Sequence, residues 1–144
     1  MLPTPRLRPW YYLIFAIPFA AAGCGPGMGQ IEGKIVWSDG SPAKELSGGQ
    51  VVFESEELKT SARGEIDSEG HFRLRTNKPD DGAAVGEYAV AIIEHRLPTG
   101  GEGSSLAAPK IETRYYDMKT SNLKATVKPG VNPVTLTVER AVRK

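Results

Sequence analysis

The chain has almost no cysteine, and its positive and negative charges nearly cancel. Cys24 is the single cysteine, so the fold cannot contain an internal disulfide and must be stabilised by burial of a core. Eighteen Lys and Arg residues stand against seventeen Asp and Glu residues, which gives a formal net charge of +1. This balance excludes a general electrostatic attraction to polyanions, and we expect no nucleic-acid partner.

The sequence also lacks the residue patterns of common catalytic and metal sites. Its two histidines, His71 and His95, show no zinc-ligand spacing, and no serine lies in a Gly-x-Ser-x-Gly motif. The glycine cluster at 100–103 lacks the strand, the helix and the lysine of a phosphate-binding loop. We therefore expect no catalytic residue, no cofactor and no metal, and we interpret the protein as a non-enzyme, with a hydrolase as the disfavoured alternative.

Scattered acidic residues leave one metal hypothesis to weigh. Five carboxylates could in principle gather around calcium, namely Asp67, Glu69, Asp80, Asp81 and Asp117. The stretch from Asp67 to Gly70 lacks the rest of a calcium loop, however. Asp67 suits an early turn position, and Gly70 can adopt the positive φ that closes a turn. The sequence therefore predicts a structural turn at Asp67 and Gly70 rather than a metal site.

The first residues have the organisation of an export signal. Arg6 and Arg8 lie in a short basic segment without acids, and residues 10–22 that follow carry no charge. As a helix this apolar run would span only about 20 Å, less than the ~30 Å hydrocarbon core of a bilayer. Pro18 also interrupts a helix there. A signal segment is therefore favoured over a stable transmembrane helix.

The residues around Cys24 resemble the lipobox of bacterial lipoproteins. Ala21, Ala22 and Gly23 place three small side chains directly before the cysteine, where a signal peptidase accepts little bulk. In that family the cysteine sulfur receives a diacylglycerol group, the preceding peptide is removed, and the new amino terminus is acylated, for example with palmitate. The resemblance implies cleavage between Gly23 and Cys24 and attachment to the membrane through lipid on Cys24. A non-lipid signal peptide cut nearby and an uncleaved anchor are the alternatives.

Beyond Gln30, apolar residues recur at every second position and not at helical spacing, which indicates β-strands. The expected strands span 31–37, 50–53, 60–66, 87–94, 123–127 and 134–138, with one more after the Asp67 turn. That turn is predicted to close a hairpin from which Phe72 and Leu74 face inward. Strand 87–94 is apolar on both faces, so we expect it in the middle of a sheet. The last two strands are predicted to pair as a closing hairpin.

About seven strands with frequent turn signals predict an all-β fold, an antiparallel two-sheet sandwich. We expect a signal segment at 1–23, a lipidated cysteine with a flexible tether at 24–29, the sandwich at 30–140 and a tail at 141–144. Within the sandwich, segment 96–112 is rich in Gly, Ser, Ala and Pro and shows no periodic pattern. We interpret it as a loop that is either functional or only mobile.

The order and spacing of five stretches resemble the transthyretin-like, carboxypeptidase-regulatory-like domains of small bacterial lipoproteins. These stretches are GKIVWSDGSPA, VVFES, EIDSEGHFRL, GEYAVAI and RYYDMKTSNLKATVKPGVNPVTLTVE. The resemblance covers residues 30–139 and implies a seven-stranded, prealbumin-type sandwich on a lipid anchor, without an established activity of its own. In relatives that accompany a zinc peptidase, the domain is an accessory to a separate catalytic domain.

These features predict an exported, membrane-anchored lipoprotein of the bacterial cell envelope, on the periplasmic or outer-membrane face. We expect a structural or binding accessory whose partners are the membrane, through Cys24, and an envelope protein or glycan. The alternative is a subunit that binds a peptide, glycan or small ligand through the 96–112 loop or a free sheet edge.

Overall fold

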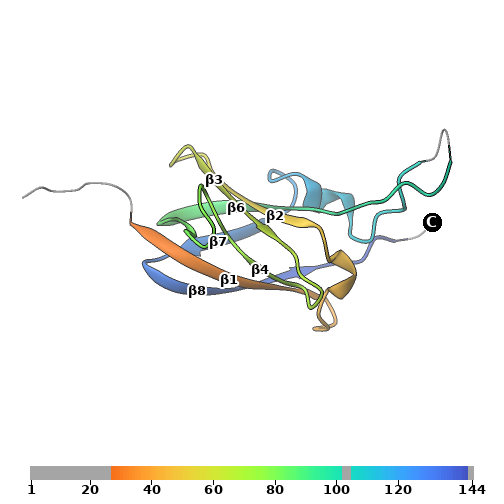
Figure 1. Cartoon of the computed structure of the whole chain (residues 1–144), viewed down its shortest axis with the longest axis horizontal. Helices are drawn as coiled ribbons and strands as arrows, with labels where there is room; N and C mark the ends of the chain where they lie inside the picture. The colour runs from red at the N-terminus through yellow and green to blue at the C-terminus, as the bar shows by residue number, and fades with distance from the viewer. Residues whose placement is uncertain (1–26, 102–104, 143–144) are drawn as a thin grey trace, which may run out of the picture.

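Two β-sheets packed face to face make up the part of the chain that the computed structural model describes, residues 27–101 and 105–142 (Figure 1). Within those residues there is no α-helix, and only two short 3-10 turns occur, η1 (Lys44–Leu46) and η2 (Thr113–Tyr116). The strands are β1 (Met28–Trp37), β2 (Gln50–Ser55), β3 (Thr60–Glu65), β4 (His71–Arg73), β5 (Ala83–Ala84), β6 (Gly86–Ile93), β7 (Leu123–Val127) and β8 (Gly130–Val138). The predicted all-β, two-sheet sandwich is confirmed.

Sheet A is organised around β1. On one side β8 runs parallel to β1, from the pair Gly29–Gly130 to the pair Trp37–Val138. On the other side β4 and β5 both pair antiparallel with β1, β4 with its middle and β5 with its start. The expectation of antiparallel pairing throughout is therefore wrong for β1 and β8. The pairing is parallel because β7, in the opposite sheet, returns the chain to the end of the sandwich at which β1 begins.

Sheet B has the strand order β3-β2-β6-β7, and all its pairings are antiparallel. The predicted inner position of β6 is confirmed, and its Tyr88, Val90 and Ile92 side chains are buried in the core. On its outer face Ala91 is buried, but the side chain of Ile93 is 50 % exposed. The expected cover on both faces of this strand is therefore incomplete toward its carboxyl end.

The predicted closing hairpin is wrong. β7 pairs with β6 in sheet B, whereas β8 pairs with β1 in sheet A, so the turn between them crosses from one sheet to the other. The Asn132 side chain holds this turn: it accepts a hydrogen bond from the Lys128 N–H and donates to the carbonyls of Lys128, Gly130 and Gln30. Two strands with one apolar face each look the same in a sequence whether their turn closes a hairpin or spans a sandwich.

The turn at Asp67 has the local geometry that its residues suggest but a different place in the fold. Gly70 has φ 84°, and the Asp67 carboxylate accepts hydrogen bonds from the N–H groups of Glu69 and His71. The strands on either side do not pair in one sheet, since β3 pairs with β2 and β4 pairs with β1. The predicted hairpin is thus a corner between the sheets, closed further along by backbone hydrogen bonds between Arg63 and Arg75.

Aromatic side chains from both sheets fill the centre of the core. The Phe53 ring of sheet B lies 6.2 Å from the Phe72 ring of sheet A and 6.1 Å from the Tyr88 ring, measured between centroids. Phe72 and Leu74 are buried, as predicted, and the Phe72 ring covers Gly33, its partner on β1. Because a Cβ at Gly33 would lie 2.0 Å from that ring, glycine makes room for the phenylalanine.

The sandwich begins slightly before the predicted boundary. Met28 and Gly29 pair with Ala84 and Ala83 of β5, so β1 includes the last two residues of the segment predicted as a flexible tether, 24–29. Only three residues then lie between Cys24 and Met28, the first residue of a central strand.

Candidate functional site

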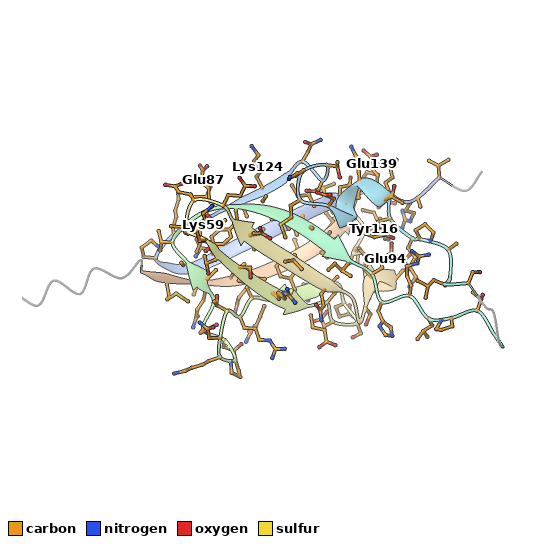
Figure 2. The ribbon with its side chains drawn as sticks, turned by 90° about the horizontal axis from the view of Figure 1, so that it is seen from above. Lys59, Glu87, Glu94, Tyr116, Lys124 and Glu139 are labelled. Atoms are coloured by element: carbon orange, nitrogen blue, oxygen red, sulfur yellow. The ribbon has the colours of Figure 1, made fainter. Side chains whose placement is uncertain are left out.

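A groove of about 780 Å³ lies on the outer face of sheet B, the face seen in Figure 2. Its walls come from β2 and the following turn, from β6, from β7 and from the segment after η2. The lining residues are Glu54–Glu57, Glu87–Ala89, Tyr116–Lys119 and Lys124–Thr126. The groove therefore depends on segments that are far apart in the sequence and are brought together only by strand pairing.

Strand register sets the cross-section of this groove. Ala89 of β6 pairs with Glu54 of β2 on one side and with Lys124 of β7 on the other, so the three side chains share the outer face. The methyl group of Ala89 is short, and it leaves a depression between an exposed carboxylate and an exposed ammonium group. The groove thus has an acidic side and a basic side.

Further charges extend both sides of the groove. Glu56 and Glu57 continue the acidic side, Glu87 adds a carboxylate on the middle strand β6, and Lys119 continues the basic side next to the carboxylate of Asp117. All of these side chains are exposed, and within residues 27–101 and 105–142 none of them takes part in an ion pair. Exposed charges of this kind suit weak, salt-sensitive contacts with a charged ligand better than they suit proton transfer in a dry site.

Ser55 and Thr126 are the groove residues with an aliphatic hydroxyl, and that of Ser55 has a structural task. The Ser55 Oγ accepts a hydrogen bond from the Leu58 N–H and closes the turn between β2 and β3. Among the groove residues there is no histidine or cysteine to activate or replace it. The arrangement is suited to binding and offers no pair of nucleophile and base.

At the end of β6, the Glu94 carboxylate forms a hub for three donors. The N–H groups of Lys110 and Ile111 donate to it at 2.9 and 2.7 Å, and the Tyr116 hydroxyl donates at 3.0 Å. Figure 2 shows Glu94 and Tyr116 side by side at this end of the sheet. Burial and the neighbouring Glu94 carboxylate raise the pKa of Tyr116 to about 12, so its hydroxyl remains a donor at neutral pH.

Segment 96–112 is not the patternless loop that its composition suggests. The N–H of Ala107 donates to the Leu97 carbonyl and the N–H of Thr99 donates to the Ser105 carbonyl, on either side of a bridge between Pro98 and Leu106. We call residues 97–101 and 105–107 the arm; Glu102, Gly103 and Ser104 lie outside the described residues. In Figure 1 the arm projects from the end of the sandwich at which β8 and the described part of the chain end.

Two exposed leucines make the arm chemically distinctive. The Leu97 side chain is 62 % exposed and that of Leu106 is 54 % exposed, although leucine is usually buried. Arg96 supports the base of the arm, because its Nε donates to the Ala107 carbonyl at 2.8 Å. The backbone pairing therefore presents both leucines to solvent, far from the residues that could cover them in the core.

A second cluster secures the carboxyl end of β8 to β1. The Arg140 guanidinium lies 4.3 Å from the centroid of the buried Trp37 ring, and its Nη1 bonds the Asp39 carboxylate at 2.9 Å. The Ser41 hydroxyl and N–H, and then Arg140, lower the pKa of Asp39 to about 2. The Trp37 indole N–H donates to Glu45 at 3.0 Å, so this cluster has a structural role.

The five carboxylates considered for calcium do not come together. Asp67, Asp81 and Asp117 each accept backbone N–H groups of their own turn. Glu69 forms an exposed ion pair with Lys44. In the described ranges no three His, Cys, Asp or Glu residues are grouped so that they could hold a metal ion.

The predicted cleavage and lipidation residues, Gly23 and Cys24, lie outside the described residues. Of the two adjacent tyrosines of η2, Tyr115 is buried and Tyr116 is half-buried. Sequence reasoning missed Glu94, Asn132 and Arg140. Their partners are mostly distant along the chain, and no local motif marks a carboxylate, amide or guanidinium that will serve as a hub.

Acidification is expected to destabilise the fold below about pH 4, because the turn carboxylates bind protons less readily in the folded state than in the unfolded chain. The pKa of Asp39 is lowered from 3.8 to about 2. The His71 N–H lowers the pKa of Asp67, and the N–H groups of Thr76, Asn77 and Lys78 lower that of Asp81 although its burial opposes them. Each lowered pKa stabilises the folded state at pH values above the pKa of the same group in the unfolded chain. This stability is lost as the pH falls through the pKa of the folded state.

The melting temperature, followed by circular dichroism, should therefore be nearly constant from about pH 7 to pH 5 and fall below about pH 4. The Asp39→Asn/Asp67→Asn double variant should have a lower melting temperature at neutral pH. Its melting temperature should also fall less steeply than that of the parent below about pH 4. A parent midpoint that does not change down to pH ~2.5 would contradict this assignment.

In the described part of the chain no helix is long and apolar enough to cross a membrane. Comparison with known proteins finds no matching family model, no matching curated protein and no matching solved structure.

Proposed function

We propose that the protein is a lipid-anchored, non-enzymatic β-sandwich of the bacterial cell envelope that acts as a structural or binding accessory. One observation carries the proposal: a segment that resembles a lipobox ends at Cys24, and the first strand of a self-contained sandwich begins at Met28. Removal of residues 1–23 would therefore take nothing from the described fold. Several acyl chains, at ~0.8 kcal/mol per buried methylene group, would make attachment effectively permanent.

The character of the groove on sheet B supports a binding role over a catalytic one. Its charged side chains are exposed to water, and its serine hydroxyl holds a turn. Catalytic groups are usually tuned by burial and by close partners, as in nucleophile and base pairs. The net charge of +1 disfavours nucleic acid as a partner, which leaves a membrane, an envelope protein or a glycan.

Replacement of the single cysteine tests the anchor. In bacterial cells, the parent chain is expected in the membrane fraction with an amino terminus at Cys24 and the mass of attached lipid. Cys24→Ser removes the sulfur that accepts the lipid, so this variant should retain residues 1–23 and carry no lipid. Gly25→Ser is the matched control and should be processed like the parent.

Mass spectrometry of the amino-terminal peptide distinguishes these products. An unmodified Cys24 in a processed, unattached product would contradict the proposal, and so would amino-terminal peptides of the parent and the Cys24→Ser variant whose masses differ only by the exchange of sulfur for oxygen.

The exposed leucines of the arm favour a second candidate function, binding of a protein or peptide through segment 96–112. A photocrosslinking amino acid at Leu106 should then give a discrete adduct in cells, because an apolar partner surface would cover this exposed side chain. Pro98→Asp, at the residue that pairs with Leu106, should abolish that adduct, and the same probe at the exposed Ser61 should give none. Equal, diffuse labelling at both positions would count against the arm as a binding element.

A further inference from the structure

Because β1 and β8 pair in parallel, both strands begin at the same end of the sandwich. Gly29 pairs with Gly130 and Gln30 with Val131, so Met28 and Pro129 precede the same pair of residues. The two strands and the turn before β8 thus form one corner of sheet A. We call Met28, Lys128, Pro129 and Val131 the proximal patch; all four side chains are exposed.

The proximal patch presents apolar side chains from a rigid support. Met28 is 47 % exposed and Val131 is 61 % exposed, and both lie on the outer face of sheet A. Val131 of β8 pairs with Gln30 of β1, and Met28 is two residues before Gln30 on the same strand. The turn beneath them is held by four hydrogen bonds of the buried Asn132 side chain. Because the turn is already ordered, contact with an apolar phase would require little further loss of conformational entropy.

Chain length limits how far this corner can move from a lipid on Cys24. Three residues lie between Cys24 and Met28, so four Cα-to-Cα steps of at most about 3.6 Å each limit the distance to roughly 14 Å. This reach is about half the thickness of a bilayer's hydrocarbon core. The opposite end of the long axis carries the arm and the described carboxyl end (Figure 1).

The two sides of the anchored end differ in charge. On the sheet B side, the β2–β3 turn contributes Glu56, Glu57 and Lys59, and Glu87 lies near the start of β6. Figure 2 shows Glu87 and Lys59 together at this end. The turn that leads into sheet A instead carries Lys128 beside the apolar residues, while Asp80 and Glu32 lie near Gln30 on the outer side of that sheet. An anionic lipid surface would attract that lysine and repel the glutamates, which favours contact through sheet A.

We propose that the protein rests on the lipid surface through the proximal patch, with Met28, Pro129 and Val131 at the level of the headgroups and Lys128 beside their phosphates. This orientation rests on the proposed lipid anchor at Cys24. It tilts the groove of sheet B and the arm away from the bilayer, toward the aqueous side where a partner can reach them.

Site-specific quenching tests the orientation. The full chain is expressed, and the processed protein is purified from membranes and reconstituted into phosphatidylethanolamine and phosphatidylglycerol vesicles with brominated acyl chains. Val131→Trp places an indole in the proximal patch, and Met28→Trp provides a second probe. Glu57→Trp at the same end on sheet B, and Thr137→Trp at the far end of β8, are the matched controls. Trp37 is buried and contributes the same background to every variant.

The emission of Val131→Trp and Met28→Trp should fall roughly twofold relative to unbrominated vesicles, because interfacial apolar groups insert about 5–10 Å. Glu57→Trp and Thr137→Trp should behave like the parent. Equal quenching of the patch and control probes, or stronger quenching at Glu57→Trp, would overturn the orientation. The mass of the same samples separates the two proposals: a lipidated Cys24 with unquenched patch probes overturns only the orientation, whereas an unmodified Cys24 overturns both.

Discussion

Phe72→Ala is expected to lower the free energy of unfolding by about 3–5 kcal/mol, the usual cost of emptying an aromatic site in a closed core. The Phe72 side chain is buried between the sheets, packs near Phe53 and covers Gly33. We expect little collapse into the space, because the backbone of β4 at Phe72 is held by its pairing with β1. Denaturant unfolding measures the loss. Arg73→Ala, an exposed neighbour on β4, is the control and should change stability by only about 0.5 kcal/mol.

The contact between Phe72 and Gly33 allows a second test of the same packing. Gly33→Ala should cost about 1–3 kcal/mol, because the added methyl group meets the Phe72 ring and forces it to move. In the Gly33→Ala/Phe72→Ala double variant the methyl group enters the vacated space. The combined loss should therefore be smaller than the sum of the single losses. Strictly additive losses would show that the ring and the glycine are not coupled as their geometry requires.

Glu94→Leu is expected to lower the free energy of unfolding by about 3 kcal/mol, because it leaves partly buried donors without an acceptor. The N–H groups of Lys110 and Ile111 and the Tyr116 hydroxyl all donate to the Glu94 carboxylate. Their loss should also release the segment that follows the arm. Hydrogen exchange at Ile111 should become faster, and denaturant unfolding should report the change in stability.

Two variants make the Glu94 result interpretable. Glu94→Gln keeps one acceptor oxygen and should lose clearly less stability than Glu94→Leu. Glu87→Leu changes an exposed glutamate on the same strand that forms no ion pair within the described residues, and should have an effect within about 0.5 kcal/mol. If Glu94→Leu were as stable as Glu87→Leu, the hub would not hold the segment in place.

Local sequence patterns were sufficient to predict the strands and their inward faces. Alternation placed Phe72 and Leu74 in the core, and the two apolar faces of 87–94 predicted an inner strand. The residue types at Asp67 and Gly70 likewise predicted the backbone of their turn, because a positive φ and a capping carboxylate are local requirements. These features depend on residues a few positions apart, so the sequence contains their causes directly.

Pairing between distant segments could not be predicted in the same way. Nothing local to 123–138 indicates that its two strands belong to different sheets, or that β8 lies parallel to β1. The groove of sheet B follows from those pairings, since Glu54, Ala89 and Lys124 share one row only in the folded register. Composition suggested a patternless loop at 96–112, yet backbone hydrogen bonds form the arm there.

The sequence by itself thus determined an all-β sandwich, the inward side chains of its strands, the Asp67 turn and the expectation of a lipid anchor at Cys24. Only the tertiary structure decided which strands are neighbours, where acidic and basic residues form a groove, and that Glu94 and Asn132 act as hubs. The reason is physical: alternation and turn chemistry act over a few residues, whereas strand pairing depends on which arrangement of the whole chain best satisfies its backbone hydrogen bonds and buries its core.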